Sequence, residues 1–296
     1  MIKSKSYKLY QTGINIIMIL VSLGTILPLV LLFTSSISSE SALIADGYSF
    51  IPKEFSLDAY KYILLNKGTI FQAYGITILV TVVGTVVNIG MSSLMAFALS
   101  DKSLPFRNII SFYVFFTMLF SGCLVPSYIM WTSTFHIKNT IWALLLPNFL
   151  MSAMNVMLIR TYFITSIPEA LYEAARIDGA GYFKIFYRIV LPLGKPILVT
   201  MGLFSGLAYW NDWTNGLYYV TDSKLYSIQT LLNKMIQDIQ AIQANAAAAS
   251  AGAAMAVPQV SVRMAIAFVA LLPILAVYPF LQKYFEKGIA LGAVKG

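Results

Sequence analysis

Long apolar stretches without charged side chains alternate with shorter polar connections along this chain. Asp, Glu, Lys and Arg are absent from residues 9–39, 68–100, 108–137, 139–159, 196–211 and 264–282. A helix needs roughly 20 apolar residues to cross the hydrocarbon core of a bilayer. The pattern therefore predicts six membrane-spanning helices, at about 14–33, 74–99, 109–130, 141–162, 197–218 and 264–281. These segments lack the polar–apolar alternation of barrel strands, so we expect an all-α polytopic membrane protein.

The composition agrees with this class. The 296 residues are 58% hydrophobic and 11% charged, and the mean hydropathy is +0.76, whereas soluble domains are about 25% charged. The chain holds one cysteine, Cys123, and one histidine, His136. Single residues cannot form an internal disulfide or a cysteine or histidine metal cluster, so we predict no metal site.

Basic residues gather on one side of the predicted topology. The two terminal tails, the link between spans two and three and the link between spans four and five together carry 13 of the 20 basic residues. Because loops rich in Lys and Arg stay in the cytoplasm, both termini are predicted to be cytoplasmic. The formal charge of +8 is then an orientation signal rather than a nucleic-acid surface. The first apolar segment is expected to be retained as a span, since no clear small-x-small cleavage site follows it.

The link between spans four and five, residues 166–196, is predicted to form two short helices. Ser166 and Glu169 have the spacing of a capping box, which predicts a helix that continues to about Asp178. Gly179 suits the left-handed residue that ends such a helix. A second helix with one apolar face is predicted from residues at i, i+3, i+4 and i+7, namely Phe183, Phe186, Tyr187 and Val190.

The same loop carries a spaced motif. Glu173-Ala174-Ala175 is followed after three residues by Gly179, and after nine more by Ile189-Val190-Leu191-Pro192. This pattern resembles the EAA loop of permease subunits in binding-protein-dependent ABC importers, and it implies a type I ABC importer permease fold. In that family the helix of the motif sits in a cleft of a cytoplasmic ATPase, and its glutamate pairs with a basic ATPase residue. The coupling residues that the resemblance implies are Glu173, Ala174, Ala175, Arg176, Asp178 and Gly179.

The resemblance extends along nearly the whole chain, so one permease domain is expected over residues 1–296. It is closest to the maltose-permease-like carbohydrate family, in the branch associated with complex oligosaccharides. The segments that carry it are 50–60, 121–128, 209–213 and 288–296. Cys123 stands where glycine is more usual in this family. The tail of maltose-type permeases reaches between the ATPase subunits, which implies ATPase contact for Gly292, Val294, Lys295 and Gly296.

Asp212 is the one acidic residue inside a predicted span. Charge within a membrane is costly, so this side chain is expected to face protein or water. Aromatic faces beside polar groups suit sugar rings, and the candidates for the substrate pathway are Tyr209, Trp210, Asn211, Asp212, Trp213 and Tyr128. Structural packing, partner contact and interfacial anchoring are the open alternatives at these positions.

Three further segments stand out. Gly202 and Gly206 have the GxxxG spacing that suits close helix packing. Residues 225–243 have a helical apolar stripe and are too polar to span, so we expect a helix that lies flat on the outer surface or packs against the partner subunit. Residues 245–256 are nearly all Ala, Gly and Ser, and their composition assigns them no role.

The sequence contains no catalytic constellation and no G-x-x-x-x-G-K-[ST] pattern. The resemblance implies a subunit without a cofactor of its own, with ATP and Mg bound by two partner ATPase subunits. A second, homologous permease would complete a heterodimer, and an extracytoplasmic binding protein would deliver the carbohydrate, all at a bacterial cytoplasmic membrane. The alternative is a secondary transporter driven by an ion gradient, which would require several intramembrane ionisable residues and internal repeats.

Overall fold

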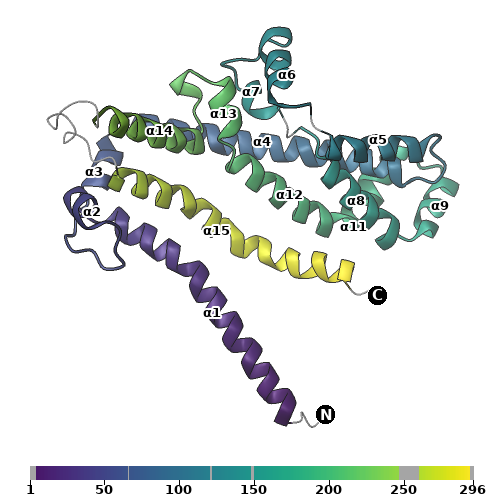
Figure 1. The fold of residues 1–296 in the computed structure, drawn as a ribbon. Coiled ribbons are helices and arrows are strands. Elements are labelled where there is room, and N and C mark those ends of the chain that lie inside the picture. Colours follow the sequence, from purple (N-terminus) through teal and green to yellow (C-terminus); the bar gives the residue numbers. More distant parts are fainter. Residues whose placement is uncertain (1–4, 66, 121, 148–149, 247–259, 294–296) are drawn as a thin grey trace. The chain divides into compact units, whose positions relative to one another are not determined.

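The computed structural model describes residues 5–293 apart from 66, 121, 148–149 and 247–259. This part of the chain is mostly helical (Figure 1), and its isolated β-bridge joins Ser38 and Phe55. It divides into two compact units, which we describe separately. Unit 1 comprises Met1–Gly68 and Leu232–Ile274, and unit 2 comprises Thr69–Leu231 and Leu275–Gly296.

The elements follow one another without an extended strand in the described residues. In chain order they are α1 (Lys5–Ser36), α2 (Glu40–Asp46), α3 (Asp58–Leu65), α4 (Lys67–Ser100), α5 (Arg107–Leu119), α6 (Leu124–Ile129), the π-helix η1 (Met130–Thr134), α7 (Trp142–Leu145), α8 (Ala153–Ser166), α9 (Glu169–Ile177), α10 (Tyr182–Ile185), the π-helix η2 (Phe186–Val190), α11 (Leu191–Leu193), α12 (Lys195–Trp210), α13 (Thr214–Tyr219), the 3₁₀-helix η3 (Ser223–Leu225), α14 (Ile228–Ala246) and α15 (Val260–Ala293).

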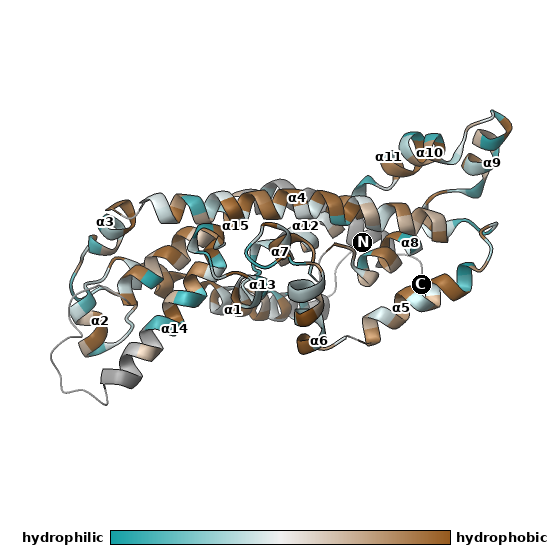
Figure 2. Cartoon of the chain, turned by 90° about the horizontal axis from the view of Figure 1, so that it is seen from above, coloured by the Kyte–Doolittle hydropathy of each residue, from teal (hydrophilic) through white to brown (hydrophobic). Residues whose placement is uncertain are grey.

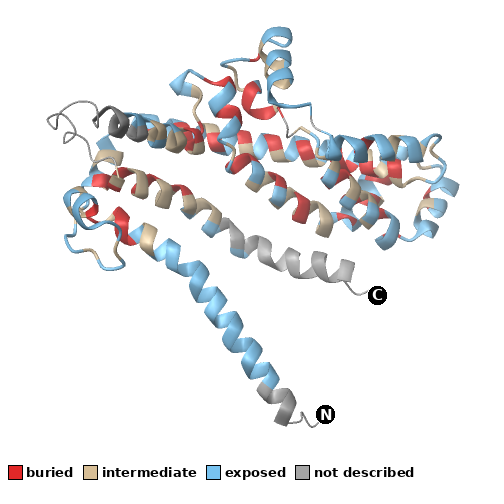
Figure 3. Cartoon of the chain, viewed as in Figure 1, coloured by how far each residue is buried: buried red, intermediate tan, exposed pale blue. Residues whose placement is uncertain are grey.

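Two helices of the described residues are long and apolar enough to cross a membrane alone, Tyr10–Ser36 in α1 and Gly68–Ser100 in α4. Large apolar side chains stay exposed along α1, as expected for a surface that meets lipid or a partner protein (Figure 3). Figure 2 shows hydrophobic residues along the length of α4 as well. These helices match the first two predicted spans, and the total of six stays a prediction.

Three predicted spans are interrupted rather than continuous helices. The segment 109–130 is divided between α5 and α6, and the helices on either side of the break differ in direction by 105°. The segment 141–162 is divided between α7 and α8, and the segment 197–218 between α12 and α13. The hydropathy pattern did not predict these breaks, because it depends on which residues prefer the membrane and not on where the backbone turns.

Local backbone chemistry explains each break. Cys123 precedes α6 with φ 59° and ψ 163°, a conformation adopted almost only by glycine. Ser152 starts α8 anew, since its hydroxyl accepts the amide of Asn155 at 3.4 Å. Asp212 lies one residue before Trp213, the N-cap residue of α13, and its carboxylate accepts the amides of Thr214 at 3.0 Å and Asn215 at 3.2 Å at the start of that helix.

The main apolar core of unit 2 surrounds α8. Val156, Ile159 and Phe163 lie on one face of α8 and are almost completely buried. They pack with buried residues from α4, the π-helix η2 and α12, among them Leu99 and Val190. Between membrane helices, association rests on van der Waals packing rather than on removal of apolar surface from water, and this close-packed cluster forms the base from which the loop between α8 and α12 projects.

A buried polar triad joins α4, α8 and α12. The side-chain amide of Asn155 donates to Oδ1 of Asn88 at 2.9 Å and to the hydroxyl of Ser205 at 2.8 Å. The Ser205 hydroxyl in turn donates to the same Asn88 oxygen at 3.0 Å. Polar hydrogen bonds between membrane helices are each worth about 0.6 kcal/mol, and the triad therefore specifies how these three helices meet.

Small residues allow α12 to approach α4 closely. A Cβ at Gly206 would lie 3.4 Å from Oγ1 of Thr85, and one at Gly202 would lie 3.9 Å from Cγ1 of Ile89. The GxxxG prediction of close packing is confirmed, and the partner helix is α4 of the same chain.

In unit 1, Glu40 joins the start of α2 to the start of α15. Its carboxylate accepts the backbone amides of Val260 at 2.9 Å and Ser261 at 2.8 Å, and the Ser261 hydroxyl at 2.7 Å. A carboxylate at the N-terminus of a helix satisfies amides that have no partner within the helix and favours the helix dipole. The segment that follows α1 is thereby attached to the start of the last long helix.

Candidate functional site

The loop that carries the spaced motif folds as two short helical segments between α8 and α12. The first is α9, and its N-cap residue is Pro168, which makes no side-chain capping bond. Ser166 is instead the last residue of α8. The predicted capping box is therefore wrong, because Ser166 belongs to the preceding helix and Pro168 occupies the N-cap position of α9.

The C-terminal end of α9 is closed by Gly179, as predicted. Gly179 has φ +73°, a left-handed conformation that costs glycine little. Its amide donates to the carbonyl of Arg176 at 3.0 Å, and the amide of Ala180 donates to the carbonyl of Ala175 at 2.9 Å. These two bonds form a Schellman motif, which fixes the direction in which the chain leaves α9.

The second segment runs through α10, η2 and α11. Phe186 and Val190 are buried, whereas Phe183 and Tyr187 are 82% and 74% exposed. The predicted apolar stripe is thus divided between the chain's own core and the surface. An 80° bend separates this segment from α12. It falls at Gly194, where a Cβ would lie 2.7 Å from Cε1 of Phe163.

Two ion pairs connect α9 to the end of α4. Arg176 Nη2 lies 2.8 Å from Asp101 Oδ2, and Lys102 Nζ lies 2.5 Å from Glu169 Oε2. Asp101 also accepts the amide and the hydroxyl of Ser103, at 2.9 and 2.8 Å. Burial alone would raise the pKa of the Asp101 carboxyl, but these bonds together with Arg176 hold that pKa below its ordinary value. Asp101 is therefore a firmly ionised partner for Arg176.

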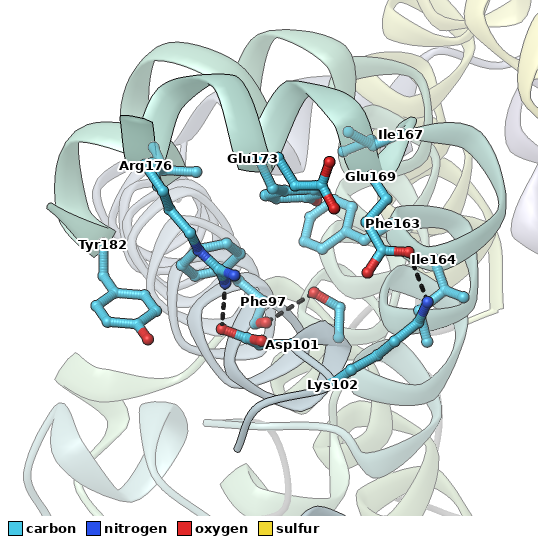
Figure 4. Close-up of a pocket in the computed structure, with 13 residues that line it drawn as sticks. Phe97, Asp101, Lys102, Phe163, Ile164, Ile167, Glu169, Glu173, Arg176 and Tyr182 are labelled. Atoms are coloured by element: carbon cyan, nitrogen blue, oxygen red, sulfur yellow. Dashed lines mark hydrogen bonds and ion pairs between the residues drawn. The ribbon is translucent and has the colours of Figure 1, made fainter. Parts of the chain in front are cut away.

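A pocket of about 170 Å³ lies beneath α9 (Figure 4). The two ion pairs form part of its wall, and Glu173 and Tyr172 of α9 also line it. The Tyr172 hydroxyl is buried without a hydrogen-bond partner among the described residues. Burial and the nearby Asp101 carboxylate raise the pKa of Tyr172. The hollow means that α9 does not lie in continuous contact with the helices below it.

The motif residues fall on different faces of α9. Ala175 is 8% exposed and packs into the chain's own core. The side chain of Ala175 is thus largely covered by this chain, and the expectation that Ala175 takes part in ATPase contact stays a prediction. Glu173, Ala174 and Asp178 are exposed. Within the described part of the chain, no ion pair holds Glu173, in contrast to Arg176.

The candidate pathway residues do not form one exposed group. Tyr209 and Trp210 are buried, and the Tyr209 hydroxyl donates to the carbonyl of Leu145 at 3.2 Å. The carboxylate of Asp212 accepts amides at the start of α13, as described above. Asn211 and Trp213 are exposed beside it. A structural reason thus exists for Asp212, whereas a role of these residues in substrate contact stays a prediction.

Tyr128 lies near the end of α6, the helix that follows the break at Cys123. Its ring stacks on Tyr219 of α13, with centroids 5.7 Å apart and an interplanar angle of 14°. The stacked pair connects α6 with α13, which are the helices that follow the breaks at Cys123 and at Asp212. Of the predicted ATPase-contacting tail, Gly292 lies within α15, and Val294, Lys295 and Gly296 lie outside the described residues, as does most of the alanine-rich stretch 245–256.

Asp101 and Lys102 were not among the residues predicted from the sequence. They directly follow the second span, and their charges are opposite to those of Arg176 and Glu169. Charge sign alone could not have found them, because 75 and 67 residues separate the partners along the chain.

An apolar helical chain that presents a two-helix loop with the EAA pattern defines a class, the membrane-embedded permeases of ABC importers. Residues 88–291 match the family described as binding-protein-dependent transport system inner membrane component, and the chain belongs to that family.

Relatives cover nearly the whole chain. It is 36% identical over 274 residues to Protein LplC of Bacillus subtilis (strain 168), which covers 92% of this chain and 90% of the relative. It is 35% identical over 289 residues to the polygalacturonan/rhamnogalacturonan transport system permease protein YtcP of the same organism, with 98% and 99% covered. A solved structure, that of a bacterial ABC transporter involved in the import of the acidic polysaccharide alginate, is similar with a TM-score of 0.79 and 28% identity, covering 95% of this chain and 98% of that one.

Proposed function

We propose that this chain is one half of the carbohydrate pathway of an ATP-driven importer and receives the movement of a cytoplasmic ATPase through the loop 166–196. The names of the relatives support carbohydrate as the substrate class, since they refer to pectin-type polysaccharides and to alginate. Complex oligosaccharides released from such polymers fit this class. Membership in the family does not favour a carrier driven by an ion gradient alone.

The observation that carries the proposal is the free outer face of the motif helices. Glu173 and Ala174 are exposed on α9. Ile177 at the end of α9, Phe183 of α10 and Tyr187 of η2 are also exposed, although they are large and mostly apolar. An exposed apolar group next to an available carboxylate suits a protein partner rather than water. On this basis α9 enters a cleft of the ATPase, and Glu173 pairs with a basic residue there.

The mechanism is alternating access. A loaded binding protein docks on the outer face, and ATP closes the ATPase dimer. The loop 166–196 then moves as one body with its helices, and the pathway opens toward the binding protein. Hydrolysis resets the inward-facing state. Rigid helices and short connections pass such movements over long distances.

The complete assembly would contain a second, related permease and two ATPase subunits. The chain itself would contribute six spans with both termini in the cytoplasm, and it would lie in a bacterial cytoplasmic membrane. ATP and Mg would bind to the ATPase subunits. The C-terminal residues Gly292, Val294, Lys295 and Gly296 would reach the ATPase as well.

Substrate contact by this subunit would come from its aromatic residues near the broken ends of the spans. Trp213 and Asn211 are exposed beside α13, and Tyr128 stacks on Tyr219 nearby. A sugar ring offers an apolar C–H face to an aromatic ring and hydroxyl groups to an amide. Tyr209 and Trp210 would support this region from within the core rather than touch the sugar.

The test is to purify the tagged chain from its native membrane in mild detergent and to identify the proteins that accompany it. Wild type is compared with Glu173→Ala, and with Asp238→Ala as a matched removal of an exposed acid on α14. We expect an ATPase, a second permease and a binding protein with wild type and with Asp238→Ala, and a weakened ATPase with Glu173→Ala. A wild-type chain that comes out alone even after mild cross-linking would contradict the proposal.

A further inference from the structure

The two residues that follow α4 hold both ends of the coupling helix α9. Lys102 pairs with Glu169, the first residue of α9, and Asp101 pairs with Arg176 in its last turn. Seven residues of helix separate these partners, or about 10 Å along the axis. Two consecutive residues thus fix the position and the rotation of α9 relative to the end of α4.

The Asp101 contact is the better shielded of the two. Its side chain is 16% exposed, and that of Arg176 is 46% exposed. Bonds from the amide and the hydroxyl of Ser103 hold the carboxylate in place. Hydrogen bonds between a guanidinium and a carboxylate are roughly twice as strong as neutral ones. The contact between Asp101 and Arg176 therefore resists displacement of α9 relative to the end of α4.

The pocket beneath α9 makes the ion pairs important for the connection between α9 and α4. The 170 Å³ pocket separates part of α9 from the end of α4 (Figure 4). A force on the exposed face of α9 would therefore reach α4 through the paired side chains beside the pocket, in addition to the core packing of Ala175. From α4 it continues to α8 and α12, because Asn88 of α4 belongs to the buried triad with Asn155 and Ser205.

We propose that Asp101 and Lys102 form a second coupling link, outside the EAA motif, which passes the movement of α9 directly into α4. They are positioning residues, since they act through Arg176 and Glu169 rather than on substrate or nucleotide. This inference rests on the proposed function, in which an ATPase moves α9.

Reversal of the charges tests the link. The complex is purified with its own ATPase and second permease and placed in lipid nanodiscs. A single cysteine at Val86, exposed on α4, carries an environment-sensitive dye in a Cys123→Ser background. The readout is the change of dye emission on addition of MgATP with vanadate. The variants are Asp101→Arg, Arg176→Asp and both together, with Asp58→Lys, Lys61→Asp and their double as a control ion pair on α3.

We expect each single variant of the Asp101 pair to reduce the ATP-driven change about tenfold, within the usual range of coupling between sites. The double variant should restore the ATP-driven change of dye emission to within about twofold of wild type. The control variants on α3 should leave this change as in wild type. If the pair served only folding, the single variants would lower the yield of complex. The double variant would then not restore the ATP-driven change of dye emission.

The outcomes separate this inference from the proposed function. If the ATPase co-purifies and MgATP moves α4 equally in wild type and Asp101→Arg, the second link does not exist. The same conclusion follows if the exchanged pair responds as poorly as the single variants. If no ATPase accompanies the wild-type chain, the proposed function itself fails.

Discussion

The ring of Tyr209 occupies the space that any side chain at Gly84 would need. A Cβ at Gly84 would lie 2.3 Å from Cζ of Tyr209, and the Tyr209 hydroxyl donates to the carbonyl of Leu145 at 3.2 Å. Glycine at this one position of α4 therefore permits α12 to cross it closely and lets Tyr209 reach α7.

Gly84→Ala should destabilise the permease by about 1–3 kcal/mol, because the new methyl group overpacks a filled site. The measurement is the thermal unfolding temperature of the purified chain in detergent. Gly90→Ala is the matched control on the same helix, since nothing lies within 4 Å of a Cβ there. An equal effect of the two substitutions would show that the Tyr209 contact is not tight.

Asn155→Ala should lower stability by about 1–2 kcal/mol, because it removes two hydrogen bonds from the buried triad. The control is Thr161→Ala, whose hydroxyl is exposed and bonds only to the carbonyl of Met157 on its own helix. Thermal unfolding of Asn155→Ala, Ser205→Ala and the double variant should also show non-additivity. Additive losses would mean that the three side chains act independently.

Phe183→Glu should weaken retention of the ATPase without lowering the stability of the permease, because Phe183 is 82% exposed. Phe186→Ala should do the opposite and destabilise the permease by about 3–5 kcal/mol, since that ring lies in the core. Co-purified ATPase and thermal unfolding are measured for both. Full ATPase retention by Phe183→Glu would exclude this residue from the docking surface.

Cys123→Gly should stabilise the chain by about 1 kcal/mol, because it relieves a backbone conformation that suits glycine. Cys123→Ala keeps the strain and removes the same exposed thiol, so it should have no such effect. Thermal unfolding distinguishes the two. A gain with alanine as large as with glycine would assign the effect to the thiol.

The contribution of Asp101 should not vary with pH in the cytoplasmic range. Its folded pKa lies below the ordinary value of 3.8, so the stability it provides is fully present above that value and is lost only as the pH falls through the lower folded pKa. The difference in unfolding temperature between wild type and Asp101→Asn should be the same at about pH 5, 6.5 and 8. A difference that shrinks between pH 8 and 5 would contradict a lowered pKa.

The sequence was sufficient to identify the family and part of the candidate coupling site. The motif depends only on spacing along the chain, so Glu173, Gly179 and Pro192 were enough to identify it. The predicted left-handed conformation of Gly179 is confirmed. The burial of Ala175 could not be predicted from the sequence, because it depends on packing with residues from other helices of the core cluster. The same holds for Asp101, whose partner is 75 residues away.

By itself the sequence determined that the chain is a helical membrane protein with a motif loop between its fourth and fifth apolar segments. Hydropathy and local spacing suffice for that, since they act over a few helical turns. Only the tertiary structure decided where the apolar segments break, which face of α9 is free, and that the end of α4 is joined to both ends of α9. Those features depend on contacts between residues distant along the chain, and apolar composition is the same whether a segment continues or turns.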